Sequence, residues 1–138
     1  MDKLGDGAIV RPEDVQTLVY DWGRINLLSE PKLTGAERMT CGLVQLAPGA
    51  GHDRHNHPGT EEIIYVLEGE GEQTVDDHGP VHVTPGSSIF VPKDAFHSTL
   101  NTGTETMRLF VVYCPTGAEE DLRSIPGVQT LPPENAVE

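Results

Sequence analysis

Short apolar runs separated by turn residues fill the central part of the chain, and no helical period runs through them. The runs are rich in β-branched and aromatic side chains, which is typical of strands. The strands that this pattern predicts lie at residues 24–27, 40–47, 62–67, 72–75, 81–84, 88–91, 96–100 and 106–113. Because turn-forming residues separate neighbouring runs, we expect residues 40–114 to form one antiparallel sandwich or barrel.

The N-terminal segment, residues 1–39, is expected to add strands at the edge of this barrel. Its apolar run at residues 15–28 has an ambiguous period. The run would suit a contact between two copies of the chain, since a small barrel gains by covering its edge. The alternative is that the run extends the sheet of its own chain.

The C-terminal segment, residues 115–138, changes pattern. Thr116 and Glu119 have the spacing of a capping box, and Pro126 follows a stretch that favours helix. We therefore expect a short helix near residues 117–124, followed by a loosely held tail.

The acidic composition of the chain excludes two classes of binding partner. Nine Lys and Arg residues against 22 Asp and Glu residues give a net charge of −13 with histidine neutral. Such a surface repels phosphate backbones and anionic lipids, so neither nucleic acid nor membrane is expected as a partner. No apolar run has the length of a signal peptide or a membrane span, which predicts a cytoplasmic protein.

The cysteines indicate no metal or disulfide motif. Cys41 and Cys114 stand far apart in the sequence without a partner motif. We expect both to be buried apolar residues, with a pairing between neighbouring strands as the alternative.

The histidines carry the candidate chemistry. His55 and His57 are one residue apart, so in an extended chain both side chains leave from the same face. Glu62 follows the Pro58 turn and opens the next strand, and His97 opens a later one. Each histidine alone could be an ordinary polar or half-buried residue. Together, imidazole nitrogens and a carboxylate are a ligand set for one divalent transition metal ion, Fe, Mn, Ni or Zn.

The spacing of these residues resembles the two motifs of the cupin superfamily. The first motif is matched by Gly49, His55, His57, Glu62 and Gly69. The second is matched by Gly86, Pro92, His97 and Asn101, with Asp94 where the family has glycine. The resemblance implies an all-β fold, the double-stranded β-helix or jelly-roll barrel, here with a short C-terminal helix. It also implies a metal inside one end of the barrel, held by His55, His57, Glu62 and His97, and pairing into a homodimer.

Two choices remain within this motif region. Glu61 also falls within the permitted interval, but only Glu62 keeps the family's spacing to Gly69, and neighbouring strand residues point to opposite faces. The other histidines have no motif role and are expected to face solvent. They are His52, His78 and His82.

The expected function is that of a metal-dependent enzyme acting on a small organic substrate, because such a ligand set leaves coordination positions open. A mononuclear Fe(II) dioxygenase or related oxidoreductase is preferred. The alternatives are a non-redox isomerase, cyclase or lyase with Zn, Mn or Ni, and a barrel that binds metal or a small ligand without turnover. Tyr65 and Tyr113 are candidate acid or base groups, although tyrosines on strands more often serve packing.

The cavity wall is expected to be largely apolar, which favours a small, partly apolar organic acid, ketone or phenol. The residues expected on this wall, where their alternation faces inward, are Leu43, Ile64, Val66, Phe90, Phe96, Phe110 and Val112.

Overall fold

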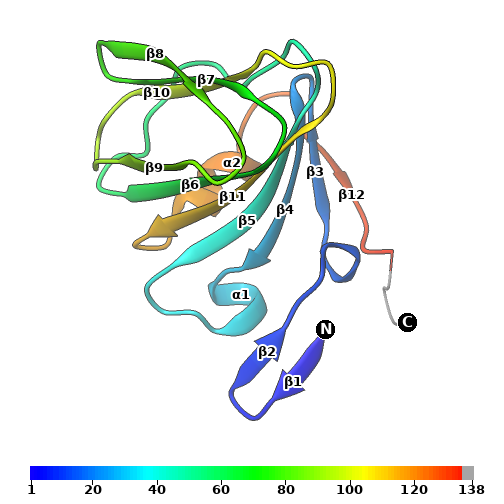
Figure 1. The fold of residues 1–138 in the computed structure, drawn as a ribbon. Helices are drawn as coiled ribbons and strands as arrows, with labels where there is room; N and C mark the ends of the chain where they lie inside the picture. The colour runs from blue at the N-terminus through cyan, green and yellow to red at the C-terminus, as the bar shows by residue number, and fades with distance from the viewer. Residues whose placement is uncertain (135–138) are drawn as a thin grey trace.

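The computed structural model describes residues 1–134 and consists mostly of antiparallel strands (Figure 1). The strands are β1 (Asp2–Leu4), β2 (Gly7–Ile9), β3 (Thr17–Tyr20), β4 (Gly23–Ser29), β5 (Thr40–Leu46), β6 (Glu61–Glu68), β7 (Gly71–Val75), β8 (His78–Val83), β9 (Ser88–Val91), β10 (His97–Asn101), β11 (Met107–Cys114) and β12 (Gln129–Leu131). The helices are the 3-10 helix η1 (Pro12–Asp14), α1 (Pro31–Thr34) and α2 (Ala118–Arg123).

Two sheets form the barrel. The larger has the strand order β12-β3-β4-β5-β11-β6-β9, and the smaller has the order β10-β7-β8. In Figure 1 the smaller sheet lies across one end of the larger one. Every pairing between strands is antiparallel. The predicted all-β jelly roll with a short C-terminal helix is confirmed.

The core lies between the sheets and is set by the period of two along each strand. On β11, Met107, Leu109, Val111 and Tyr113 are buried, while the residues between them are half-buried. On β6, Glu62, Ile64 and Val66 are buried and the residues between them are exposed. One face of these two strands therefore lines the interior and the other forms the outer surface of the barrel.

The predicted cavity wall is partly wrong. Phe90 and Phe96 are 53% and 43% exposed, and Phe110 and Val112 lie on the half-buried outer face of β11. The sequence of β11 is apolar on both faces, so its alternation does not show which set points inward. The pairing of β11 with β5 and β6 decides this.

The N-terminal segment divides into two parts. The run at residues 15–28 joins the chain's own sheet as β3 and β4, with Leu18, Ile25 and Leu27 buried. The β1–β2 hairpin instead projects from the barrel near the N-terminus (Figure 1).

The C-terminal segment contains the expected helix and, beyond it, a strand that its composition does not suggest. Helix α2 confirms the helix expected near 117–124, but Gly117 occupies the N-cap position and no side chain caps it. Glu119 accepts hydrogen bonds from the backbone N–H of Gly117 at 2.7 Å and from Thr40 Oγ1 at 2.9 Å. The sequence does not predict β12, which pairs with β3 inside the expected loose tail. The end of that tail, residues 135–138, lies outside the described residues.

The two cysteines are free thiols on the neighbouring strands β5 and β11. Cys41 is half-buried and Cys114 is exposed, so the expectation that both are buried is wrong. Cys114 is the last residue of β11 and follows the inward-facing Tyr113, which places it on the outer face. Within the described chain, no helix is long and apolar enough to cross a membrane.

Candidate metal centre

The structure brings the predicted metal ligands together from three separate stretches of chain. His55 and His57 lie in the loop between β5 and β6, Glu62 lies near the start of β6, and His97 is the first residue of β10. The backbone N–H of His55 donates to the carbonyl of His97 at 3.0 Å, and the N–H of His97 donates back to the carbonyl of His55 at 2.8 Å. One ring nitrogen from each of the three histidines lies within 4.8 Å of the others, a group that could hold a metal ion.

Asp94 helps to hold this arrangement at the position where the cupin motif has glycine. Its φ of 67° lies in the left-handed region, which aspartate tolerates better than most residues. Its Oδ1 accepts a hydrogen bond from the N–H of Gly59 at 2.7 Å, and its carbonyl accepts one from the Asn56 amide at 3.2 Å. The substitution therefore keeps the turn and ties the two histidine-bearing loops together.

Backbone carbonyls orient two of the three imidazoles. His55 Nδ1 lies 2.6 Å from the carbonyl of Asp53, and His97 Nδ1 lies 3.2 Å from the carbonyl of Ala95. A carbonyl oxygen can only accept, so each Nδ1 is the donor in these contacts and Nε2 is the nitrogen turned towards the other ligands. Protein metal sites commonly orient histidine ligands in this way.

Glu62, and not Glu61, points into the barrel. Glu62 is 4% exposed, and its Oε1 lies 3.0 Å from His97 Nε2 and 3.6 Å from His57 Nε2. Glu61 is exposed on the opposite face of β6. The carboxylate therefore contacts two of the three histidines.

Unpaired polar atoms converge at this point. Among the described residues, both ring nitrogens of His57 and Oε1 of Glu62 are buried and have no hydrogen-bond partner. A buried polar atom without a partner costs about 1–3 kcal/mol, so a cluster of them requires an explanation. A cation bound between these lone pairs would supply the missing partner. The residues present fit a divalent metal ion on this ground.

The protonation states also suit metal binding. Burial, together with the charges of neighbouring histidines, lowers the pKa of His57 to about 3 and that of His55 to about 4. Burial raises the pKa of the Glu62 carboxyl above its usual value. Both imidazoles are therefore neutral at pH 7, and their lone pairs are available without loss of a proton.

A cavity of about 40 Å³ opens beside these residues. Its lining is aromatic, aliphatic and histidine-rich and contains no Lys or Arg: Trp22, Ile25, Val44, Leu46, His52, His55, Glu62, Ile64, His97, Thr99, Leu109, Val111, Tyr113 and Leu122. The space suffices for an ion and about one water-sized ligand. Only the reacting end of an organic substrate would enter it.

The two candidate tyrosines differ in position. Tyr113 is 3% exposed, lines this cavity, and meets the ring of His57 edge-on with 5.1 Å between ring centroids. Burial and the charge of Glu62 raise the pKa of Tyr113 well above its usual value, so the phenol stays protonated. Tyr65 is 40% exposed on the outer face of β6 and does not line the cavity.

His52 is a cavity histidine that the motif spacing does not predict. It is half-buried, lines the cavity and stacks on His55 with 3.8 Å between ring centroids. The expectation that it faces solvent is therefore wrong, whereas His78 and His82 are exposed as predicted. The motif spacing gives no signal for His52, because that position varies freely within the motif.

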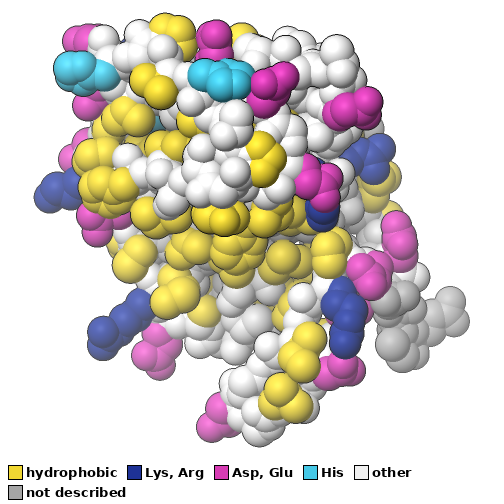
Figure 2. All heavy atoms as spheres, in the orientation of Figure 1, with side chains coloured by type: hydrophobic (Ala, Val, Ile, Leu, Met, Phe, Trp, Pro, Cys, Tyr) yellow, Lys and Arg dark blue, Asp and Glu magenta, His cyan; other side chains and the backbone are white. Residues whose placement is uncertain are grey.

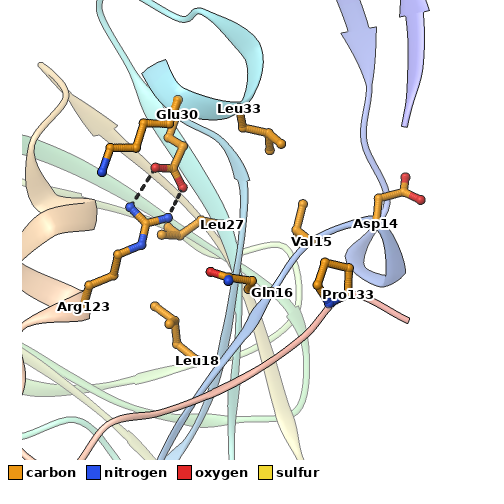
Figure 3. A pocket seen from close by; sticks show the side chains of 10 residues that line it. Asp14, Val15, Gln16, Leu18, Leu27, Glu30, Leu33, Arg123 and Pro133 are labelled. Atoms are coloured by element: carbon orange, nitrogen blue, oxygen red, sulfur yellow. Dashed lines mark hydrogen bonds and ion pairs between the residues drawn. The ribbon is translucent and has the colours of Figure 1, made fainter. Parts of the chain in front are cut away.

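A larger pocket of about 360 Å³ lies elsewhere, between η1, α1, β3, β4 and α2 (Figure 3). In this pocket both terminal guanidinium nitrogens of Arg123 donate hydrogen bonds to the Glu30 carboxylate, Nη1 at 2.7 Å (Figure 3). Glu30 is 4% exposed, so this ion pair joins helix α2 to the segment that follows β4. None of the candidate ligands lines this pocket.

Comparison with known proteins agrees with this geometry. The family model for the cupin domain matches residues 42–113. Protein SchB of Streptomyces halstedii is 31% identical over 122 residues, which cover 88% of each chain. Polyketide synthase CurC of Streptomyces cyaneus is 31% identical over 123 residues, covering 88% of this chain and 78% of the relative.

Among solved structures, a predicted oxalate decarboxylase from Thermotoga maritima superposes with a TM-score of 0.69 at 22% identity. The match covers 79% of this chain and 100% of the other, and at that identity it shows the fold alone. On the family match and the two relatives, this chain belongs to the cupin domain family.

Proposed function

We propose that the chain is a metal-dependent cupin enzyme that binds one divalent transition metal ion through His55, His57, Glu62 and His97. The observation that carries this proposal is the convergence of three imidazoles on one buried carboxylate, where both ring nitrogens of His57 and Oε1 of Glu62 have no hydrogen-bond partner among the described residues. When bound, a metal would supply a Lewis acid that polarises a substrate oxygen. Fe, Mn, Ni and Zn all accept this ligand set.

The substrate that we propose is a small neutral ketone or phenol. No Lys or Arg lines the cavity, and the chain carries a net charge of −13. A dianion such as oxalate would therefore depend on the bound divalent ion alone for charge compensation, because no cationic side chain lines the cavity. The apolar wall formed by Ile25, Val44 and Ile64 favours a neutral group instead.

The reaction that we favour is a non-redox isomerisation or cyclisation through an enol. Tyr113 keeps its proton at neutral pH and can donate it as a hydrogen bond to a developing enolate oxygen in the cavity. The relative named polyketide synthase CurC supports a substrate of the polyketide type, in which ketones and phenols are the reacting groups. The Fe(II) dioxygenase preferred from the sequence is the second candidate, since the same ligand set suits Fe(II).

Turnover with defined metals tests this proposal. The metal-free protein is loaded in turn with Fe(II), Mn(II), Ni(II) or Zn(II) and incubated with neutral diketones, phenols and oxalate. Product detected by mass spectrometry without oxygen uptake supports the isomerase or cyclase, whereas oxygen uptake with Fe(II) supports the dioxygenase. Binding of metal and ligand with no product under any condition would support the non-catalytic barrel and contradict an enzyme.

Two tyrosine variants serve as a matched pair in that assay. Tyr113→Phe removes the cavity phenol, and we expect a loss of about 100-fold in kcat, within the range typical of one hydrogen-bond donor to a developing oxyanion. Tyr65→Phe makes the same change on the outer face of β6 and is expected to leave kcat unchanged. Equal rates in both variants would remove Tyr113 from the reaction.

We also propose that the protein forms a homodimer through the outer face of β6, β9 and β11. Ile63, Tyr65, Leu67 and Phe90 are each at least 39% exposed there. Figure 2 shows hydrophobic side chains gathered across the middle of this view, over the region where β6 and β11 lie in Figure 1. An exposed apolar patch of this kind suits association through apolar contacts.

The projecting β1–β2 hairpin also supports a second copy of the chain as the partner that covers this face. An isolated two-stranded hairpin is marginally stable in water, and Leu4 and Ile9 on it are 63% and 44% exposed. Sedimentation of the wild type is expected to give twice the chain mass, and Tyr65→Lys combined with Phe90→Lys is expected to give the monomer. A monomeric wild type would contradict this interface.

A further inference from the structure

We infer that His52 is a positioning residue that holds the imidazole of His55 in the orientation required for metal binding. His52 lies outside the metal ligand set and is not one of the fixed positions of the cupin motif. This inference rests on the proposed metal site, and it concerns how one ligand of that site is kept in place.

A column of stacked rings runs from helix α2 to His55. Tyr20 stacks on Trp22 with 4.6 Å between centroids and planes 5° apart. Trp22 stacks on His52 at 4.6 Å and 17°, and His52 stacks on His55 at 3.8 Å and 30°. At the far end, the Tyr20 hydroxyl donates to the carbonyl of Leu122 in α2 at 2.6 Å. The column is therefore anchored to the body of the protein and not only to the loop that carries His55.

The backbone that carries His52 is also fixed. Gly51 pairs with Leu100 of β10, and a Cβ built at Gly51 would lie 2.2 Å from the carbonyl oxygen of Thr99. The N–H of Asn101 donates to the carbonyl of Ala50 at 2.9 Å. His52 thus leaves the strand pairing at a defined point, directly beneath Trp22 and against the ring of His55.

His55 needs such support more than its neighbours do. His57 and His97 are 6% and 2% exposed and are surrounded by the barrel, whereas His55 is only half-buried in a surface loop. The bond from His55 Nδ1 to Asp53 ends within the same loop, so it does not tie the ring to the sheet. Metal–ligand distances hold within about 0.2 Å, and a ring that tilts moves its Nε2 lone pair out of line. The planar face of His52 restricts that tilt.

The experiment measures Co(II) binding to metal-free protein by absorption spectroscopy, which reports both affinity and ligand geometry. We expect His52→Ala to weaken Co(II) binding by about 10-fold, the lower end of the cost for groups that orient metal ligands, and to alter the d–d bands. His52→Phe keeps a planar ring in the column and is expected to restore the wild-type affinity and bands. His82→Ala removes an exposed histidine of β8 and is the matched control.

Three outcomes decide the inference. Wild-type affinity and spectrum in His52→Ala would overturn it. Failure of His52→Phe with a metal-free Tm equal to that of the wild type would also overturn it, because the stacked plane would then not be what His52 provides. Undiminished Co(II) binding in His55→Ala would instead refute the proposed metal site itself, so the two failures are distinguishable.

Discussion

Glu62 is the residue where the requirements of folding and metal binding oppose each other most directly. Its Oε1 is buried without a hydrogen bond, and burial raises the pKa of its carboxyl. Glu62→Gln removes the buried charge and brings an N–H donor towards His57 Nε2, which lies 3.6 Å from Oε1. We therefore expect the metal-free variant to be more stable than the metal-free wild type.

The magnitude follows from the unpaired atoms. An unsatisfied buried polar group costs about 1–3 kcal/mol. The glutamine amide can donate to His57 Nε2 but leaves the other unpaired nitrogen of His57 without a partner. We therefore expect the free energy of unfolding to rise by about 1 kcal/mol, the lower end of this range. For a domain of this size that gain raises Tm by roughly 4 °C. With excess metal the wild type is expected to be the more stable of the two proteins. A ligand at 100 times its Kd adds about 2.7 kcal/mol to the free energy of unfolding, and this gain goes to the wild type alone.

Urea unfolding at pH 7, with EDTA and then with excess Zn(II), measures the difference in stability between the two proteins without metal and with it. Glu61→Gln is the matched control, because it makes the same change on the exposed face of β6. A Glu62→Gln variant that is less stable than wild type in EDTA would refute the reasoning. It would show that the 3.0 Å contact between Glu62 and His97 is a stabilising ion pair in the metal-free protein.

The remaining predictions concern other parts of the chain. Arg123→Met leaves the buried carboxylate of Glu30 uncompensated, and urea unfolding is expected to show a loss of about 3 kcal/mol. Iodoacetamide is expected to label the exposed Cys114 before the half-buried Cys41, whose thiol pKa is raised by burial, as mass spectrometry of timed samples would show. The pKa of His57 is lowered from its ordinary value of 6.5 to about 3 in the folded protein. Between these two pH values the unfolded chain therefore binds more protons than the folded one. Calorimetry of the metal-free protein should therefore show Tm falling as pH drops below about 6.5, opposed in part by the raised pKa of the carboxylate in the same cavity.

The grouping of the three histidines with Glu62 was predictable because its signal lies in fixed spacings. His55 and His57 share a face whenever the chain is extended, and the motif distances place Glu62 and His97 at matching points of a barrel. The structure brings all four together, with Glu62 inward and Glu61 outward. The motif spacing to Gly69 chose Glu62, and alternation along β6 then assigned Glu61 to the opposite face.

The cavity wall was less predictable because it depends on pairing between strands. β11 is apolar on both faces, so the sequence alone could not show that Tyr113 points inward and Phe110 outward. His52 was missed for a related reason. Its stacking depends on Trp22, which the turn between β3 and β4 places against it.

Metal content of protein purified from its native host tests the central claim most directly. The account predicts about one equivalent of a transition metal per chain in the wild type and less than about a tenth of that in His97→Ala, which removes the proposed ligand on β10. Wild-type protein without transition metal, or a His97→Ala variant that retains the full amount, would contradict it.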